Sequence, residues 1–218
     1  MRRVLLFALL ALTAIPAAFY TESAMATETP KYTVLKEDGD FELRRYEPRI
    51  VAEVSVDGDL DSASGKGFRI LADYIFGNNR VAPNASVTVA PEASTKIAMT
   101  APVSLEPISQ TKALTGAREW RVEFTMPSEY TLATLPKPNN PSIRIREIPA
   151  KTYAAVRYSG MNTESRINEE NQRLVEWVKR DGLVANGLPE LARYNPPWTL
   201  PMFKRNEILI PVEDSVQK

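Results

Sequence analysis

The chain has 218 residues, with 27 lysines and arginines against 27 aspartates and glutamates, and it has no cysteine and no histidine. A neutral balance gives no electrostatic footprint for nucleic acid or for an acidic membrane surface. The missing residue types exclude disulfides, thiolate and imidazole metal ligands, and Ser-His-Asp catalysis. Apolar residues make up 44% and charged residues 25% of the chain, as is typical of a globular protein.

The N-terminal segment has the pattern of a secretory signal peptide. Arg2 and Arg3 precede the uncharged run Val4–Ile15, and Ala24-Met25-Ala26 provides a small-x-small cleavage site. The run is shorter than the ~20 residues of a standard membrane span. We expect residues 1–26 to be a signal peptide. The protein would then be exported, and periplasmic if bacterial; the alternative is a membrane anchor formed by an uncleaved N-terminal segment.

The second half of the chain repeats the pattern of the first half. Residues 41–58 align without a gap with residues 143–160. Further matches follow in the same order: LADYI (71–75) with LVEWV (174–178) and VEFTMP (122–127) with NEILIP (206–211), and the matched residues include Arg44 with Arg146, Gly58 with Gly160 and Glu123 with Glu207. We expect a pseudo-twofold pair of ββαββ units in one domain over about residues 31–213, with a cleft for a small molecule between helices and sheet.

In chain order, the first half begins with two predicted strands, Tyr32–Leu35 and Phe41–Tyr46. A third strand, Ile50–Val56, alternates apolar with polar or small residues. After a helix and a loop-rich stretch, we expect strands at Ile97–Leu105, interrupted by Pro102, and at Trp120–Met126.

The first predicted helix runs from about Asp61 to Phe76, with Asp61 or Ser62 as its N-cap and Gly77 as its stop. One apolar face follows the i, i+3, i+4, i+7 spacing and is formed by Phe68, Leu71, Ala72 and Ile75. We expect this face to lie near a pocket, although packing against the sheet would require the same spacing.

Two glycines interrupt this helix near its start. Gly65 and Gly67 each cost about 1 kcal/mol relative to alanine. Either the first turn is irregular and tolerated, or a flat ligand approaches the helix closely.

The second half begins after the proline-rich segment LPKPNNP at 135–141. A helix is predicted at Thr163–Arg180, with Asn162 or Thr163 as its N-cap. Its apolar face consists of Ile167, Leu174, Trp177 and Val178. Strands at Leu191–Tyr194 and Glu207–Pro211 complete the chain, with the segment PPWTLP (196–201) between them.

The remaining acidic, basic and hydroxyl side chains form no recognisable catalytic constellation, and no glycine-rich phosphate loop is present. We therefore predict no catalytic residue and no metal ligand. Any chemistry would belong to a bound ligand.

The sequence resembles the SOUL family of haem-binding proteins. The resemblance is carried by FRILADYIFGNN (68–79), KIAMTAPV (96–103), VEFTMP (122–127), LPKPNNP (135–141), AAVRYSG (154–160), ARYNPPWTLP (192–201) and RNEILIPV (205–212). It implies an α+β fold, a twisted β-barrel-like sheet flanked by two helices, similar to effector-binding domains of bacterial regulators. It also implies that haem or another tetrapyrrole binds non-covalently in an apolar cleft beside the first helix.

The resemblance also indicates which residues would hold the ligand. The binding residues would be Phe68, Leu71, Ala72, Ile75 and Met99. The basic positions of the family are Gly65 and Asp73 here, so Lys66 and Arg69 would replace them near the propionates. Arg80 is an alternative partner for the propionates. Without histidine, an axial ligand to the iron would be Met99 or Tyr74, and burial of the ring alone is sufficient for micromolar affinity.

We therefore expect an exported carrier, scavenger or buffer of haem or a related tetrapyrrole, with a small hydrophobic ligand as its partner and no nucleic acid. One alternative is a protein that binds another apolar molecule, a lipid or a partner protein through the same cleft. A further alternative is an enzyme that modifies tetrapyrroles.

Overall fold

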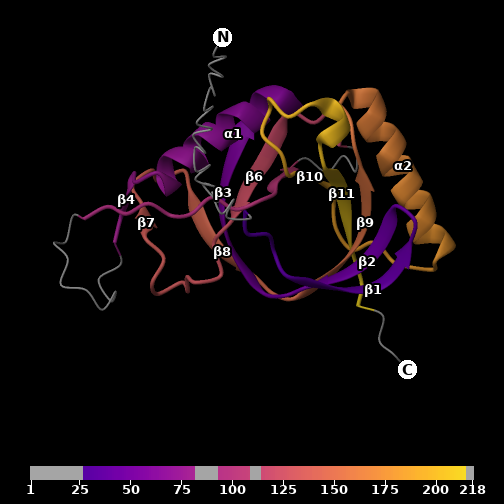
Figure 1. The fold of residues 1–218 in the computed structure, drawn as a ribbon, viewed down its shortest axis with the longest axis horizontal. Helices are drawn as coiled ribbons and strands as arrows, with labels where there is room; N and C mark the ends of the chain where they lie inside the picture. Colours follow the sequence, from indigo (N-terminus) through magenta and orange to yellow (C-terminus); the bar gives the residue numbers. More distant parts are fainter. Residues whose placement is uncertain (1–26, 82–92, 109–113, 215–218) are drawn as a thin grey trace, which may run out of the picture.

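The computed structural model describes residues 27–81, 93–108 and 114–214, so the predicted signal peptide of residues 1–26 lies outside the described residues. The described chain forms a nine-stranded antiparallel sheet that curls into a half-barrel, with two helices on its convex side (Figure 1). The prediction of a barrel-like sheet with two flanking helices is confirmed. Neither helix in the described ranges is long and apolar enough to cross a membrane.

The first half contributes β1 (Tyr32–Asp38), β2 (Phe41–Tyr46), β3 (Arg49–Asp57), α1 (Leu60–Ile75), β4 (Asn79–Arg80), β5 (Val103–Pro107) and β6 (Glu119–Thr125). The second half contributes β7 (Lys137–Pro138), β8 (Arg144–Ile148), β9 (Lys151–Tyr158), α2 (Glu164–Arg180), β10 (Glu190–Arg193), the single 3-10 turn Pro201–Phe203 and β11 (Asn206–Val212). β4 and β7 form a separate two-stranded ribbon beside the C-terminal end of α1 (Figure 1).

The strand order of the large sheet is β1-β2-β9-β11-β10-β5-β6-β3-β8. Exchanging β2 for β8, β3 for β9, β5 for β10 and β6 for β11 returns the same order from β2 to β8, read in reverse. This is the order that a twofold relation through the β10–β5 boundary requires. Gly58 and Gly160, which align in the sequence, both have positive φ, at 135° and 106°, and each follows the long strand of its half.

The helix α1 begins at Leu60, one residue earlier than predicted. Its N-cap is Asp59, whose Oδ1 accepts a hydrogen bond from the Ser62 amide at 2.8 Å, so the expectation of Asp61 or Ser62 as the cap was wrong. Asp61 instead accepts a hydrogen bond from the Arg193 guanidinium at 3.0 Å. Asp59, Asp61 and Ser62 are all suitable N-cap residues, so the sequence indicated a cap without fixing its position.

The helix α2 follows its prediction closely. Thr163 is its N-cap and accepts a hydrogen bond from the Arg166 amide, and Lys179 and Arg180 lie in its last turn, where they suit the helix dipole. The four residues predicted for its apolar face are all buried.

The predicted strand Ile97–Leu105 is shorter in the structure. The segment from Thr95 to Pro102 starts beside the end of α1, where the Ile97 amide donates to the Ile75 carbonyl at 2.8 Å, and continues to Glu28, whose carbonyl accepts from the Ala101 amide. The strand β5 begins only at Val103, after Pro102, which cannot donate a hydrogen bond to a ladder.

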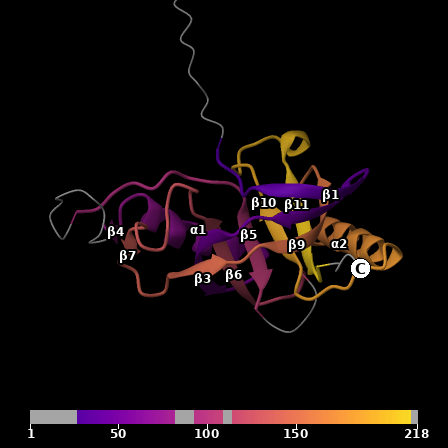
Figure 2. The same cartoon turned by 90° about the horizontal axis from the view of Figure 1, so that it is seen from below.

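The main core lies between the convex face of the sheet and the two helices. α1 packs on β3 and β6, and α2 packs on β9 and β11. Because successive side chains of a strand point to opposite faces, the residues between core positions point to the concave side. A second, smaller cluster of buried apolar residues gathers there, formed by Tyr46, Tyr153, Ala155, Ala192 and Leu209. Figure 2 shows the same curled sheet from below, with α2 on its outer side.

Candidate functional site

The predicted apolar face of α1 divides between the core and an exposed flank. Leu71 and Ile75 are 0% and 1% exposed, Ala72 is also buried, and the core alone accounts for their spacing. Phe68 is 38% exposed, and its ring meets Phe124 of β6 edge-on with the centroids 5.6 Å apart. Of this face, Phe68 is the large apolar side chain that a ligand can contact without unpacking the core.

Gly67 explains why α1 comes so close to the sheet. A Cβ at this position would lie 2.5 Å from Cγ2 of Val122 in β6, whereas a Cβ at Gly65 would meet nothing within 4 Å. The close approach at Gly67 is therefore to the protein's own sheet.

The exposed flank of α1 lies toward β10. Arg193, the last residue of β10, donates to Oγ of Ser64 at 3.2 Å and to Oδ1 of Asp61 at 3.0 Å. Phe68 follows Ser64 by four residues and thus occupies the same side of the helix. Met99, which is 40% exposed, lies in the segment that starts beside the end of α1.

An apolar loop begins two residues after Arg193. Its most exposed member is Trp198, at 84%, and the other exposed apolar side chains of the loop are Leu200, Met202 and Phe203. The loop is fixed at its base, where the Gly160 amide donates to the Pro201 carbonyl at 3.0 Å and the Tyr194 amide donates to the Arg205 carbonyl at 3.2 Å. Phe68, Met99 and this loop, which are exposed apolar groups of α1, of the segment before β5 and of the segment after β10, are together called the α1 flank surface.

The basic residues predicted near a propionate are all exposed. Nζ of Lys66 donates to the Asp57 carbonyl at 3.0 Å, and Arg69 and Arg80 project from the outer surface of the first half. Lys66 and Arg69 lie within two residues of Phe68 in the sequence of α1.

The two residues considered as iron ligands differ in access. Tyr74 is buried, and its hydroxyl donates to the Pro136 carbonyl at 2.7 Å. This bond ties the end of α1 to the LPKPNNP segment, so the Tyr74 hydroxyl has a structural partner and faces away from solvent. Met99 is accessible at the surface.

A further cavity lies elsewhere, at one end of the sheet. It has a volume of about 660 Å³ and is lined by the start of β3, the residues after β6 and the segment Glu28–Lys31. A small inner hollow of about 20 Å³ shares Pro30, Arg49 and Thr125 with it and reaches Glu123 and Glu190. Sequence reasoning did not predict these cavities.

Two ion pairs on the concave face relate the halves of the chain. Nη1 of Arg44 lies 2.7 Å from Oε2 of Glu207, and Nη2 of Arg146 lies 2.9 Å from Oε1 of Glu123. The sequence repeat matches Arg44 with Arg146 and Glu207 with Glu123, so the pairs are equivalent. The matches of the two arginines and of the two glutamates were the sequence signals for this face.

The surroundings of the two carboxyls differ. Glu207 also accepts hydrogen bonds from Arg205 and from the Tyr194 hydroxyl at 2.8 Å, and these cations and donors lower its pKa although burial acts in the opposite direction. Glu123 has Arg146 alone as a hydrogen-bond donor among the described side chains. Burial, and the neighbouring carboxylates of Glu190, Glu53 and Glu106, raise the pKa of Glu123 to about 7.

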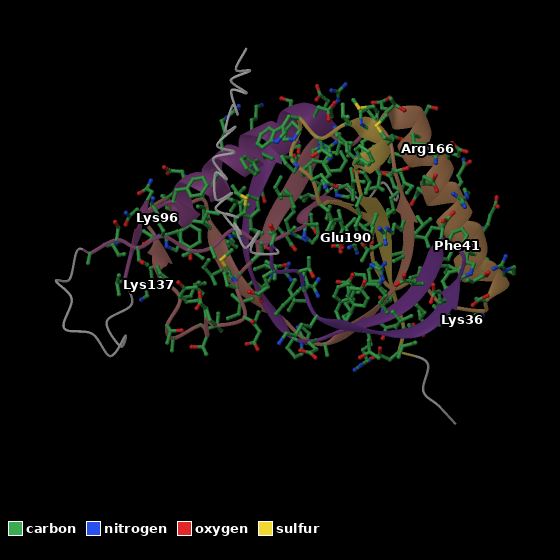
Figure 3. The ribbon with its side chains drawn as sticks, viewed as in Figure 1. Lys36, Phe41, Lys96, Lys137, Arg166 and Glu190 are labelled. Carbon is green, nitrogen blue, oxygen red and sulfur yellow. The ribbon has the colours of Figure 1, made fainter. Side chains whose placement is uncertain are left out.

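Glu190 of β10 lies inside the curve of the sheet, on the side away from both helices (Figure 3). It has no hydrogen bond or ion-pair partner among the described residues, and burial raises its pKa. In the described ranges, no three acidic side chains are grouped in a way that could hold a metal ion.

Several solved structures of other proteins have a similar fold. The curled sheet with two helices on its convex side is an effector-binding-domain-like fold: the C-terminal domain of EcmrR superimposes with a TM-score of 0.57 at 17% identity, covering 84% of this chain and 98% of that domain. EcmrR in its DNA complex gives 0.56 at 16% identity, over 80% of this chain and 57% of that one. A hydrolase from Listeria innocua gives 0.54 at 10% identity, over 82% and 94%. At these identities the likeness concerns the fold alone.

The family is shown by sequence. The model of the SOUL heme-binding protein family matches residues 27–211. The chain therefore belongs to the SOUL heme-binding protein family, as the motifs indicated. No match to a curated protein was found.

Proposed function

We propose that the protein is an exported carrier, scavenger or buffer of haem or a related tetrapyrrole, which it binds on the α1 flank surface without a histidine ligand. Membership of a haem-binding family supports the ligand class. The observation that carries the location is the exposure of large apolar side chains, Phe68 and Met99 beside α1 and Trp198 in the adjoining loop.

The physical basis is burial of an apolar ring. Each Å² of apolar surface removed from water contributes about 25 cal/mol, and micromolar affinity requires about 8 kcal/mol net. We assign the propionates at the solvent edge of the ring to Lys66 and Arg69, the exposed basic residues nearest to Phe68 in the sequence of α1. Leu71, Ala72 and Ile75 support this surface from below, because they hold α1 against the sheet.

The proposal of export is based on the signal-peptide pattern of residues 1–26. It is independent of the proposal that the α1 flank surface is the ligand site. A lipid or another apolar molecule is the alternative ligand of the same surface. Titration with a fatty acid in parallel with haem distinguishes the two ligands.

The test is titration of the protein, lacking residues 1–26, with ferric haem, followed by Soret absorbance. Phe68→Asp should weaken binding by about tenfold or more, because a carboxylate would lie against the ring. The fold should persist, since Phe68 is partly exposed. Val184→Asp, at an exposed apolar residue beyond α2, is the matched control and should leave the affinity unchanged.

Leu71→Asp is a poor test of binding. Leu71 is fully buried, so a carboxylate there would unfold the protein whatever its ligand. Absence of a saturable Soret change at tens of micromolar protein would refute haem as the ligand. Equal affinities of the Phe68→Asp and Val184→Asp variants would refute the location.

A further inference from the structure

Five large apolar side chains are exposed at one end of the molecule. Four belong to the loop between β10 and β11, and the fifth is Met161, which precedes α2. Residues 195–203 of the loop include no charged side chain. We call Met161, Trp198, Leu200, Met202 and Phe203 the loop patch. A cluster of exposed large apolar side chains on a folded protein usually marks a surface that binds a partner.

The loop patch forms one surface although it comes from two segments of the chain. In Figure 1 the yellow loop between β10 and β11 lies at the top of the view, between α1 and α2. The Gly160 amide, just before α2, donates to the Pro201 carbonyl at 3.0 Å. Nζ of Lys204, the residue that follows the loop patch, lies 4.0 Å from Sδ of Met161. These contacts bring Met161 to the loop.

The loop is held in one shape by its own hydrogen bonds. The Thr199 amide donates to the Pro196 carbonyl at 3.1 Å, and the Phe203 amide donates to the Leu200 carbonyl at 2.9 Å. Prolines further restrict the backbone, and Pro201 begins the 3-10 turn that carries the last two members of the loop patch. Because it is ordered before binding, the loop patch loses little conformational entropy when it meets a partner.

The size and composition of the loop patch favour a lipid bilayer over a protein partner. A specific protein interface takes about 20–30 residues from each side, whereas the loop patch has five large side chains. A bilayer requires no matching shape and accepts apolar side chains one by one at its interface. Tryptophan is enriched at that interface, and Trp198, at 84%, has the largest exposed fraction in the loop patch.

The charges beside the loop patch suit the phosphate layer of a bilayer. The two segments that form this surface, residues 157–163 and 193–206, contain Arg157, Arg193, Lys204 and Arg205 and no acidic residue. Among the described residues, Lys204 has no acidic partner within ion-pair distance. Its ammonium group can therefore contact lipid phosphate while its alkyl chain lies along the apolar side chains.

We propose that the loop patch is a membrane-docking element that enters the interface of a lipid bilayer. Trp198, Leu200 and Phe203 lie among the headgroups and the upper acyl chains, and Lys204 meets lipid phosphate. Burial of apolar surface supplies the affinity, so a zwitterionic bilayer is sufficient. The loop patch shares side chains with the α1 flank surface, but docking requires neither a tetrapyrrole nor Phe68.

Tryptophan fluorescence tests the insertion directly. Trp198 is its own reporter, because the other two tryptophans, Trp120 and Trp177, are buried. The protein is used without haem and without residues 1–26, whose apolar run would itself bind lipid; the described fold begins at residue 27. Phosphatidylcholine vesicles should shift the emission to shorter wavelength, and lipids brominated on the upper acyl chain should quench it.

Salt separates apolar insertion from attraction between charges. The shift should persist in about 0.5 M NaCl, where attraction between exposed charges is largely screened. No change of emission at millimolar lipid would refute the proposal. Binding that needs anionic lipid and disappears in salt would overturn insertion by apolar side chains.

Variants locate the docking. Phe203→Asp keeps the reporter and should weaken partitioning into vesicles by about tenfold or more. Val184→Asp, beyond the opposite end of α2, is the matched control and should partition as the wild type does. Equal partitioning of these two variants would contradict the assignment to the loop patch.

Two further measurements separate this proposal from its alternatives. Phe68→Asp should bind vesicles as the wild type does, so that failure of docking and failure of tetrapyrrole binding are distinguishable; loss of vesicle binding in this variant would contradict docking by the loop patch alone. Analytical ultracentrifugation without lipid should show a monomer. A dimer that Phe203→Asp abolishes, together with no binding to vesicles, would assign the loop patch to a second copy of the chain and overturn the proposal.

Discussion

Glu123 and Glu207 occupy matched positions in the two halves of the chain, yet their carboxyl pKa values shift in opposite directions. Each carboxyl is paired with the matched arginine, Arg146 or Arg44, across one intervening strand. The difference arises from the neighbours, since Arg205 and Tyr194 add donors to Glu207, whereas Glu53, Glu106 and Glu190 add negative charge around Glu123. In the repeated fold, the carboxylate of Glu207 is thus surrounded by hydrogen-bond donors, whereas that of Glu123 is surrounded mainly by other carboxylates.

The raised pKa of Glu123 predicts that stability falls as pH rises through the neutral range. In the folded protein its pKa is about 7, against an ordinary value of 4.5, so between these values the folded state binds more protons than the unfolded state. The free energy of unfolding then decreases with rising pH, by about 1.4 kcal/mol for each unit of pKa difference once the window is crossed. Glu190, whose pKa is also raised, acts in the same direction.

Urea unfolding at several pH values between about 5 and 8 measures this slope. Glu123→Gln has no charge to titrate and should flatten the slope. Glu207, whose pKa is lowered, has the opposite sign: its contribution is present above its ordinary pKa and is lost as pH falls below it. An identical slope in wild type and Glu123→Gln would show that Glu123 is not the titrating group.

The two equivalent arginines should differ in their contribution to stability. Arg44→Met leaves the fully buried Glu207 short of its main cation and should cost about 3–5 kcal/mol. Arg146→Met should cost about 1 kcal/mol or less, because the Arg146 side chain is 44% exposed and Glu123 accepts a proton near neutral pH. Chemical denaturation at pH 7 compares the two, and equal losses would mean that the networks are energetically equivalent.

The internal repeat made the order of elements within each half predictable. Residues matched in the sequence, such as Gly58 with Gly160 and Glu123 with Glu207, take equivalent places in a sheet whose order is unchanged on exchanging the halves. Alternation located the strands, but no local pattern marks which strands neighbour one another. The predicted strand from Ile97 was wrong over its first half, because apolar residues there pack beside α1 outside the sheet.

The candidate sites were less accessible from sequence, for a physical reason. A helical spacing of apolar residues fits both a core face and a ligand face, so it could not separate the buried Leu71 and Ile75 from the exposed Phe68. The small hollow that Glu190 and Arg49 line depends on which strand faces converge when the sheet curls. Glu190 and Arg49 are far apart in sequence, and neither belongs to a motif that would have indicated their proximity.

The two glycines of α1 should respond oppositely to alanine. Gly67→Ala places a methyl group against Val122 and should destabilise the protein by about 1–3 kcal/mol through overpacking. Gly65→Ala meets open space and should stabilise it by about 0.5–1 kcal/mol, because alanine loses less backbone entropy in a helix. Thermal unfolding followed by circular dichroism tests both. A stabilised Gly67→Ala variant would show that α1 can move off the sheet at no cost.

The spectrum of bound haem should report weak axial ligation. Tyr74 is engaged with Pro136, and Met99 is accessible but lies in a segment without regular structure. We expect ferric haem to bind in a high-spin form. Met99→Ala should lower the affinity by about two- to fivefold through lost apolar contact, with the Soret maximum unmoved.

Tyr74→Phe should leave the spectrum and affinity unchanged and cost about 1 kcal/mol of stability through the lost hydrogen bond. Absorption spectra of the three proteins decide the matter: a low-spin spectrum that disappears in Met99→Ala would establish the thioether as an iron ligand, contrary to this expectation.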